Sequence, residues 1–300
     1  MINHLNDTHK QLMVHWVGEK SKVVICLARD PAAVVPGFAA VNPSAVYISY
    51  DDGDTYENKT DIFKMSNGSF ATLEKFYNHP KYNTHFVFTD IRHNLMYVTT
   101  NHGRNFTKRE LHFTPSDISF HEHHSSTFVV LDKNDTNQKL WITEDFGEHF
   151  RLAHEFVKSF YWMKDANENQ QLIVQRYEPN GLSSIIYSKN LFKSRASQIY
   201  TTNVKDFSFK GDYLFTTKVN SKADVELYVS YKLGKLVRCV FNSVQSFKSY
   251  FIVDVTGSRA FVAASHSDNS SNLYVSENLA GNDGEVKFTL SLEDVFAYFP

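Results

Sequence analysis

A short apolar strand that ends in serine or threonine recurs along the whole chain and constrains the fold more than any other feature. Counted at the last residue of the strand, the copies follow one another about every 45 residues, a spacing typical of repeat architectures. A second apolar run precedes each of the last five copies, and its β-branched and aromatic residues favour a strand. The six copies end at Ser49, Thr99, Thr143, Ser188, Ser230 and Ser276.

A third recurrence lies further upstream, where the segments KSFYW, KDFSF and KSYFIV follow Val157, Val204 and Phe247. With one more strand after each turn, every unit has four strands. Four short antiparallel strands at this period are the sequence form of a propeller blade. We therefore predict an all-β fold, a β-propeller with four-stranded blades. The predicted blades span approximately residues 10–68, 69–114, 115–156, 157–203, 204–246 and 247–295.

The turn after the third strand is best preserved in the first unit, where it fits the Asp-box pattern Ser-x-Asp-x-Gly-x-Thr-aromatic. Its carboxylate can accept nearby hydroxyl and N–H groups, and its glycine can take the positive φ that the turn needs. Weaker copies occupy residues 99–106 and 143–150, and the later three have largely lost Asp and Gly. We interpret these turns as structural rather than metal-binding or catalytic. The residues assigned to them are Ser49, Asp51, Gly53, Thr55, Tyr56, Asp145 and Gly147.

Charge and composition exclude several classes of protein. The chain carries 31 Lys and Arg against 33 Asp and Glu, so no bulk electrostatic signal indicates nucleic acid or an anionic membrane. The longest aliphatic stretch, Val23 to Ala28, is much shorter than the roughly 20 residues that span a bilayer. The first ten residues lack the apolar segment of a signal peptide. We expect any partner to be recognised locally, and we expect no cofactor.

Two cysteines and six glycosylation sequons bear on the cellular compartment. Cys26 and Cys239 both lie in apolar runs, where a buried thiol is the usual interpretation and a bridge between the two is the alternative. Asn-x-Ser/Thr sequons would be glycosylated in the secretory pathway, where we expect this chain to reside. The sequon residues are Asn6, Asn58, Asn67, Asn105, Asn134 and Asn269.

Neither catalysis nor metal binding has a clear centre in the sequence. His121 and His123 belong to a histidine-rich segment, 121–124, that resembles a metal site, and in a strand they would share one face. No Cys or acidic cluster accompanies them, so we favour an exposed loop. Sialidase-like propellers also carry Asp boxes, but their chemistry needs an arginine cluster, and the nine arginines here are scattered. We predict no catalytic and no metal-binding residues.

Lysine recurs at one position of the repeat. Lys158, Lys205 and Lys248 begin the first strand of their units, the strand nearest the tunnel of a propeller. Repeated ammonium groups there could meet acidic or C-terminal carboxylates of peptides, although three solvated strand ends are the alternative. Histidines could also release a ligand as the pH falls.

The ordered set of motifs resembles the Vps10p-domain family, the sortilin family of sorting receptors, and is similar above all to its sortilin-related branch. The resemblance spans nearly the whole chain. Its most similar stretches are residues 5–30, HEFVKSFYW at 154–162, RYEPNGLSS at 176–184, SHSDNSSNLYVSE at 265–277 and KFTLSLEDV at 287–295.

This resemblance implies a luminal or extracellular module that binds peptides and proteins, including propeptides, and carries them among Golgi, endosomes and cell surface. It also implies a ten-bladed propeller followed by a membrane span, so we expect this chain to be a partial domain with exposed, aggregation-prone blade edges. In the sortilin branch an arginine after the sixth blade's third strand meets a ligand carboxylate, but residues 276–284 contain none. A sialidase-like hydrolase and a structural scaffold are the alternative functions.

Overall fold

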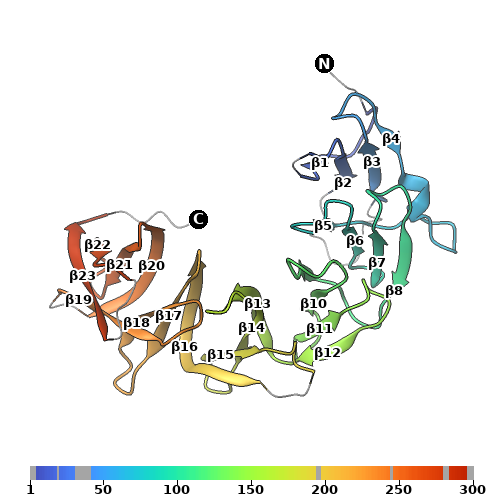
Figure 1. The fold of residues 1–300 in the computed structure, drawn as a ribbon. Coiled ribbons are helices and arrows are strands. Elements are labelled where there is room, and N and C mark those ends of the chain that lie inside the picture. Colours follow the sequence, from blue (N-terminus) through green and yellow to red (C-terminus); the bar gives the residue numbers. More distant parts are fainter. Residues whose placement is uncertain are drawn as a thin grey trace. The chain divides into compact units, whose positions relative to one another are not determined.

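The computed structural model describes residues 5–18, 20–30, 42–193, 197–243, 246–279 and 284–295. Within these ranges the chain forms strands and one short 3-10 helix, η1 (Thr60–Phe63). Its internal contacts divide it into two compact units, Met1–Glu155 and Phe156–Pro300. Figure 1 labels the elements along the chain. The prediction that the fold is all-β is confirmed.

The first unit contains three separate antiparallel sheets of four strands each, and the strands of each sheet follow one another in chain order. The first sheet contains β1 (Gln11–Trp16), β2 (Val24–Arg29), β3 (Ala45–Ser49) and β4 (Glu57–Asn58). The second contains β5 (Lys75–Asn78), β6 (Phe86–Asp90), β7 (Leu95–Thr99) and β8 (Thr107–Glu110). The third contains β9 (Asp117–Phe120), β10 (Phe128–Asp132), β11 (Lys139–Thr143) and β12 (Arg151–His154).

The second unit pairs its strands into one continuous sheet of eleven. Strands β13 to β19 lie side by side in chain order. Strand β19 then pairs in parallel with β23, and β22, β21 and β20 follow β23 in reverse chain order. Its first strands are β13 (Val157–Lys164), β14 (Gln170–Tyr177), β15 (Ser183–Ser188), β16 (Gln198–Lys210), β17 (Tyr213–Val219) and β18 (Val225–Tyr231). The others are β19 (Val237–Phe241), β20 (Phe247–Thr256), β21 (Arg259–His266), β22 (Ser271–Ser276) and β23 (Glu285–Leu292).

Strand β16 explains why this sheet is continuous. It is 13 residues long: its first part pairs with β15, and from Val204 onward it pairs with β17. One strand therefore serves as the last strand of one four-stranded group and the first strand of the next. Counted in this way, each predicted blade range contains four strand segments, and we propose these ranges as the blades.

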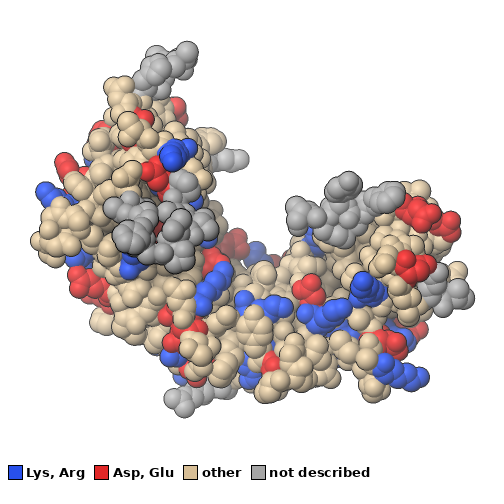
Figure 2. Space-filling view, turned by 180° about the vertical axis from the view of Figure 1, so that it is seen from behind, with Lys and Arg blue, Asp and Glu red and all other residues tan. Residues whose placement is uncertain are grey.

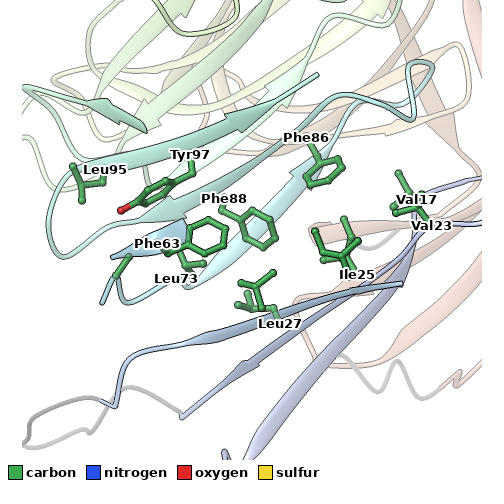
Figure 3. Close-up of a cluster of buried hydrophobic side chains, with 13 residues drawn as sticks. Val17, Val23, Ile25, Leu27, Phe63, Leu73, Phe86, Phe88, Leu95 and Tyr97 are labelled. Atoms are coloured by element: carbon green, nitrogen blue, oxygen red, sulfur yellow. The ribbon is translucent and has the colours of Figure 1, made fainter. Parts of the chain in front are cut away.

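The sheets pack through the side chains of their central strands. In the first unit, Ile25 and Leu27 of β2 point toward the rings carried by β6 and β7 (Figure 3). Phe63 lies with its ring centroid 4.9 Å from that of Tyr97 and 5.5 Å from that of Phe88. Full burial of such a side chain contributes about 1.5–3 kcal/mol. These contacts hold the first two sheets face to face.

Each cysteine lies in the apolar interior of its own unit, Cys26 on β2 of the first unit and Cys239 on β19 of the second. Cys26 and Cys239 are free and buried. Burial raises the pKa of both thiols above the ordinary value. Each behaves as a small apolar side chain of its strand.

Candidate functional site

The first Asp-box turn, Ser49 to Tyr56, is closed by its own side chains. The hydroxyl of Ser49 donates to Asp51 Oδ1 at 2.8 Å and accepts the N–H of Gly53 at 2.8 Å. Thr55 donates to the same carboxylate from its N–H at 2.8 Å and from its hydroxyl at 2.6 Å. These bonds, those of Thr55 foremost, lower the pKa of Asp51 to about 2. The carboxylate thus accepts hydrogen bonds from within its own turn.

The glycine and the aromatic residue of the turn are linked. Gly53 has a φ of +93°, a conformation that glycine adopts without steric penalty. A Cβ atom at Gly53 would lie 3.2 Å from the hydroxyl oxygen of Tyr56. The Tyr56 hydroxyl is hydrogen-bonded to the Cys26 thiol of β2. The aromatic residue therefore folds back onto its own sheet.

The third turn repeats this arrangement with histidine in place of threonine. Thr143 donates to Asp145 Oδ1 at 2.8 Å and accepts the N–H of Gly147 at 2.9 Å. His149 contacts the same carboxylate through its N–H at 2.9 Å and its Nδ1 at 2.7 Å. Burial acts in the opposite direction, but these bonds lower the pKa of Asp145 to about 2. The second turn has the same core, with Asn101 in the place of Asp145.

The fourth turn keeps the geometry although its sequence has changed. Ser188 donates to Asn190 Oδ1 at 2.8 Å and accepts the N–H of Phe192 at 2.9 Å. Phe192 stands where the earlier turns have glycine, yet it has a φ of +60°. Loss of Asp and Gly from the pattern therefore does not mean loss of the turn.

A backbone hydrogen bond recurs even where these side chains are absent. The residue two or three positions after the strand's recurrent Ser or Thr donates its N–H to the loop between the first two strands of the same four-stranded group, at 2.8 to 3.1 Å. This bond ties two loops of one group together. The donor and acceptor pairs are Asp52 and Lys22, His102 and Thr84, Phe146 and Ser126, Lys232 and Asp212, and Leu279 and Ser258.

The histidine-rich segment lies in a turn, not in a strand, because β9 ends at Phe120. His123 and His124 are exposed as expected, whereas His121 is buried. The Nδ1 atom of His121 accepts the N–H groups of His123 and His124, each at 3.2 Å. Burial of the ring, with the neighbouring histidines, lowers the pKa of His121 to about 4. His121 therefore holds the turn.

His79 has the same role at the end of β5, and the sequence analysis missed it. Its Nδ1 accepts the N–H groups of Lys81 and Tyr82, each at 3.1 Å. The available signal was a histidine directly after the first strand in two successive repeats. Among the described residues, no group of three or more His, Cys, Asp and Glu side chains could hold a metal ion.

The three recurrent lysines occupy equivalent irregularities of their strands. In each strand the register shifts at the lysine, so that the lysine has no opposite residue on the neighbouring strand. This occurs at Lys158 in β13, at Lys205 where β16 begins to pair with β17, and at Lys248 in β20, and we call the three residues the bulge lysines. Such β-bulges change the direction of a side chain. All three lysines are exposed. The structure thus places three ammonium groups at matching positions of three consecutive groups of strands.

Two of these lysines are in contact. Lys205 Nζ donates to the backbone carbonyl oxygen of Lys248 at 3.2 Å, and Lys248 Nζ donates to Asn269 Oδ1 at 3.4 Å. An ammonium group has three donors, and each of these bonds uses one of them. Figure 2 shows basic and acidic side chains interspersed over one face of the molecule.

The family of the chain follows from its sequence as a whole. The model of the family described as "Sortilin, neurotensin receptor 3", Sortilin-Vps10, matches residues 44–298. The chain belongs to the sortilin (Vps10) family. The Vps10 domain is a β-propeller, and with the four-stranded sheets described above this membership confirms the predicted fold class.

Individual members of the sortilin family align over almost the whole chain. The human and mouse sortilin-related receptors are both 34% identical to it over 306 residues, which cover 99% of this chain and 13% of each receptor. The mouse VPS10 domain-containing receptor SorCS1 is 23% identical over 303 residues, 97% of this chain and 24% of that receptor. The chain therefore spans a small part of the length of these relatives, which are named as receptors and not as enzymes.

Among solved structures, the dihydro-heme d1 dehydrogenase NirN matches this sortilin-family chain with a TM-score of 0.49 and 11% identity. The match covers 91% of this chain and 55% of that chain. At this level of similarity it bears on neither activity nor ligand.

The glycosylation sequons of this sortilin-family chain are accessible in the structure. All six sequon asparagines lie in described ranges and are exposed, so glycan attachment at these positions fits the folded chain. Over the part of the chain that the structure describes, no helix is long and apolar enough to cross a bilayer.

Proposed function

We propose that this chain is a ligand-binding propeller of a sorting receptor, which binds peptides and proteins, propeptides among them, on the luminal or extracellular side of Golgi, endosomal and plasma membranes. Membership of the sortilin family carries this proposal. The family description names a neurotensin receptor, and the curated relatives are receptors. Binding, not catalysis, is the activity that we assign.

We call β13, the β17-paired part of β16 and β20 the inner strands, and we propose their bulged starts as the contact surface. Strands β13 and β20 are sheet edges, and an extended peptide can add to an edge by main-chain hydrogen bonds. The ammonium groups of Lys158, Lys205 and Lys248 supply charge complementary to acidic side chains or a C-terminal carboxylate. Backbone pairing would give affinity, and the lysines would give preference for anionic peptides.

Capture of peptides by the glycosylated, secreted chain tests the function. Immobilised propeptides of secreted proteins and an acidic peptide should bind saturably at neutral pH, and a peptide with Gln in place of each Glu should bind more weakly. Absence of saturable binding to the whole panel would contradict the proposal. Hydrolysis of sialosides or glucans by the same preparation would contradict the assignment as a binding module.

A further inference from the structure

A cavity of about 360 Å³ opens in the second unit, between β16, β17 and β18 on one side and β20 on the other. This volume lies near the lower end of the range of small-ligand pockets, about 300–1,000 Å³. Its floor is apolar and buried, formed by Phe215, Leu227 and Ile252. Its rim is largely polar, with Asp206, Ser208 and Lys210, and also includes the exposed ring of Phe251.

The register of the strands shows why a space remains here. Ser208 of β16 lies directly opposite Phe215 of β17, and directly opposite residues of an antiparallel pair project from the same face. That face packs against Ile252 and Tyr250 of β20 in one hydrophobic cluster. The small hydroxymethyl group of Ser208 therefore stands where a larger side chain would complete the packing.

Neighbouring groups of strands have a ring at this position. Measured from the bulge lysines, Tyr161, Ser208 and Phe251 are equivalent, because each follows its lysine by three residues. Tyr161 packs with its ring centroid 5.1 Å from that of Phe207 and 5.0 Å from that of Phe209, on the next group of strands. Ser208 has no ring to pack in this way against Tyr250 and Ile252 of the next group, and the cavity lies between them.

We propose that this space, the Ser208 cavity, binds one aromatic side chain of a peptide ligand. This proposal rests on the proposed function and gives it a specificity pocket. An aromatic ring suits a site walled by Phe215 and Tyr250, since ring pairs attract beyond the burial of their area. The side chain would enter past the polar rim, which can contact the main chain of the ligand.

The bulge lysines indicate that the same peptide also carries a carboxylate. Lys205 lies three residues before Ser208 on β16, a separation of about 10 Å in extended chain. A peptide lying along β16 would place a carboxylate near Lys205 and Lys248 when its aromatic residue enters the cavity. The ligand class is thus a peptide with an acidic and an aromatic residue about three positions apart.

Capped pentapeptides test this class directly on the full 300-residue chain. The probes are Glu-Ala-Ala-Phe-Ala, its reversed order Ala-Phe-Ala-Ala-Glu, and the matched peptides with Ala for Phe or Gln for Glu. At least one order of the Phe peptide should bind about tenfold more tightly than its Ala counterpart, measured by NMR titration. Equal binding of Phe and Ala peptides in both orders would overturn the proposal, and this comparison needs no variant.

Filling the cavity from within gives an independent measurement. Ser208→Phe should abolish the preference for Phe over Ala and raise the Tm, whereas the control Ser249→Phe, on an exposed residue of β20, should leave the preference unchanged. Retention of the preference by a folded Ser208→Phe chain would overturn the proposal. Saturable binding of propeptides without any dependence on Phe would overturn the Ser208 cavity alone and leave the proposed function standing.

Discussion

The ammonium group of Lys205 donates a hydrogen bond to the backbone carbonyl oxygen of Lys248, with 3.2 Å between Nζ and O. The bond joins the bulges of two equivalent strands, β16 and β20. It orients one lysine toward the other and brings positive charge together beside two adjacent strand starts. We derive predictions for the ligand site that we propose here and for the stability of the turns.

The hydroxyl group at the start of an Asp-box turn should be a measurable part of stability. Thr143 is buried and its hydroxyl both donates to Asp145 and accepts the N–H of Gly147. Asp145 keeps its bonds from His149 in Thr143→Val, but the buried Gly147 N–H loses its acceptor, so we expect a loss of about 1–3 kcal/mol in the free energy of unfolding. Denaturant titration measures it. Thr289→Val at an exposed position of β23 is the control, and an equal effect of both changes would refute the role of the turn.

Glycine in the second turn should be required for space as well as for conformation. A Cβ atom at Gly103 would lie 2.6 Å from Ile48 Cδ1 and 2.9 Å from Phe86 Cζ, whereas a Cβ atom at Gly68 would meet nothing within 4 Å. Both glycines have positive φ, so Gly68→Ala measures the conformational penalty alone, about 1–2 kcal/mol. Gly103→Ala should add about 1–3 kcal/mol for overpacking. Equal losses in thermal or chemical unfolding would be inconsistent with the packing described.

Acidification should weaken the turn held by His121. The pKa of this histidine is about 4 in the folded chain against 6.5 without the protein environment. The unfolded chain therefore takes up the proton first, and stability should fall as the pH drops from about 6.5 towards about 4. After burial, the charges of His124, His123 and His79 add to this lowering of the pKa, whereas Glu122 acts in the opposite direction.

His121→Asn isolates this effect, because an amide oxygen can accept the same backbone N–H groups without titrating in this range. The decrease in Tm between neutral pH and about pH 5 should become smaller in this variant. His123→Asn, at an exposed neighbour, should keep the full decrease. A pH dependence of Tm that is unchanged in His121→Asn would assign the effect to other groups.

Glycosylation should accompany expression through the secretory pathway. The side chains of Asn134 and Asn269 are exposed in polar loops, so transfer of a glycan requires no unfolding. Treatment with an amidase that removes N-glycans should lower the apparent mass of the secreted chain, and Asn134→Gln should remove one step of the shift. An unchanged mass after treatment would contradict secretory residence of this chain.

Local chemistry made the strands and the first turns predictable from the sequence. The apolar run that ends at Ser49 and the Asp51–Gly53 pattern depend on neighbours a few positions apart, so residue types alone indicate the structure. The fourth turn could not be predicted in this way. Phe192 keeps a positive φ in a buried setting, where its side chain is 4% exposed, and only tertiary packing can compensate that strain.

The candidate site was likewise predictable only in part. The repeat placed Lys158, Lys205 and Lys248 at equivalent positions, but their bulges depend on strand register, which the sequence does not specify. The Ser208 cavity depends on packing against β20 and became visible only once the strands were paired. An alignment of the three inner strands could have shown Ser208 as the small residue between two aromatic ones.

Charge reversal of the bulge lysines tests the central claim most directly. The triple variant Lys158→Glu, Lys205→Glu and Lys248→Glu should bind an acidic peptide or propeptide at least tenfold more weakly, about 1.4 kcal/mol, with the same fold by circular dichroism. The control reverses three exposed lysines outside the inner strands, Lys189, Lys222 and Lys287, and matches the change in net charge. Selective loss in the first variant is the predicted result; equal affinity of both variants for the acidic peptide would contradict ligand binding at the inner strands.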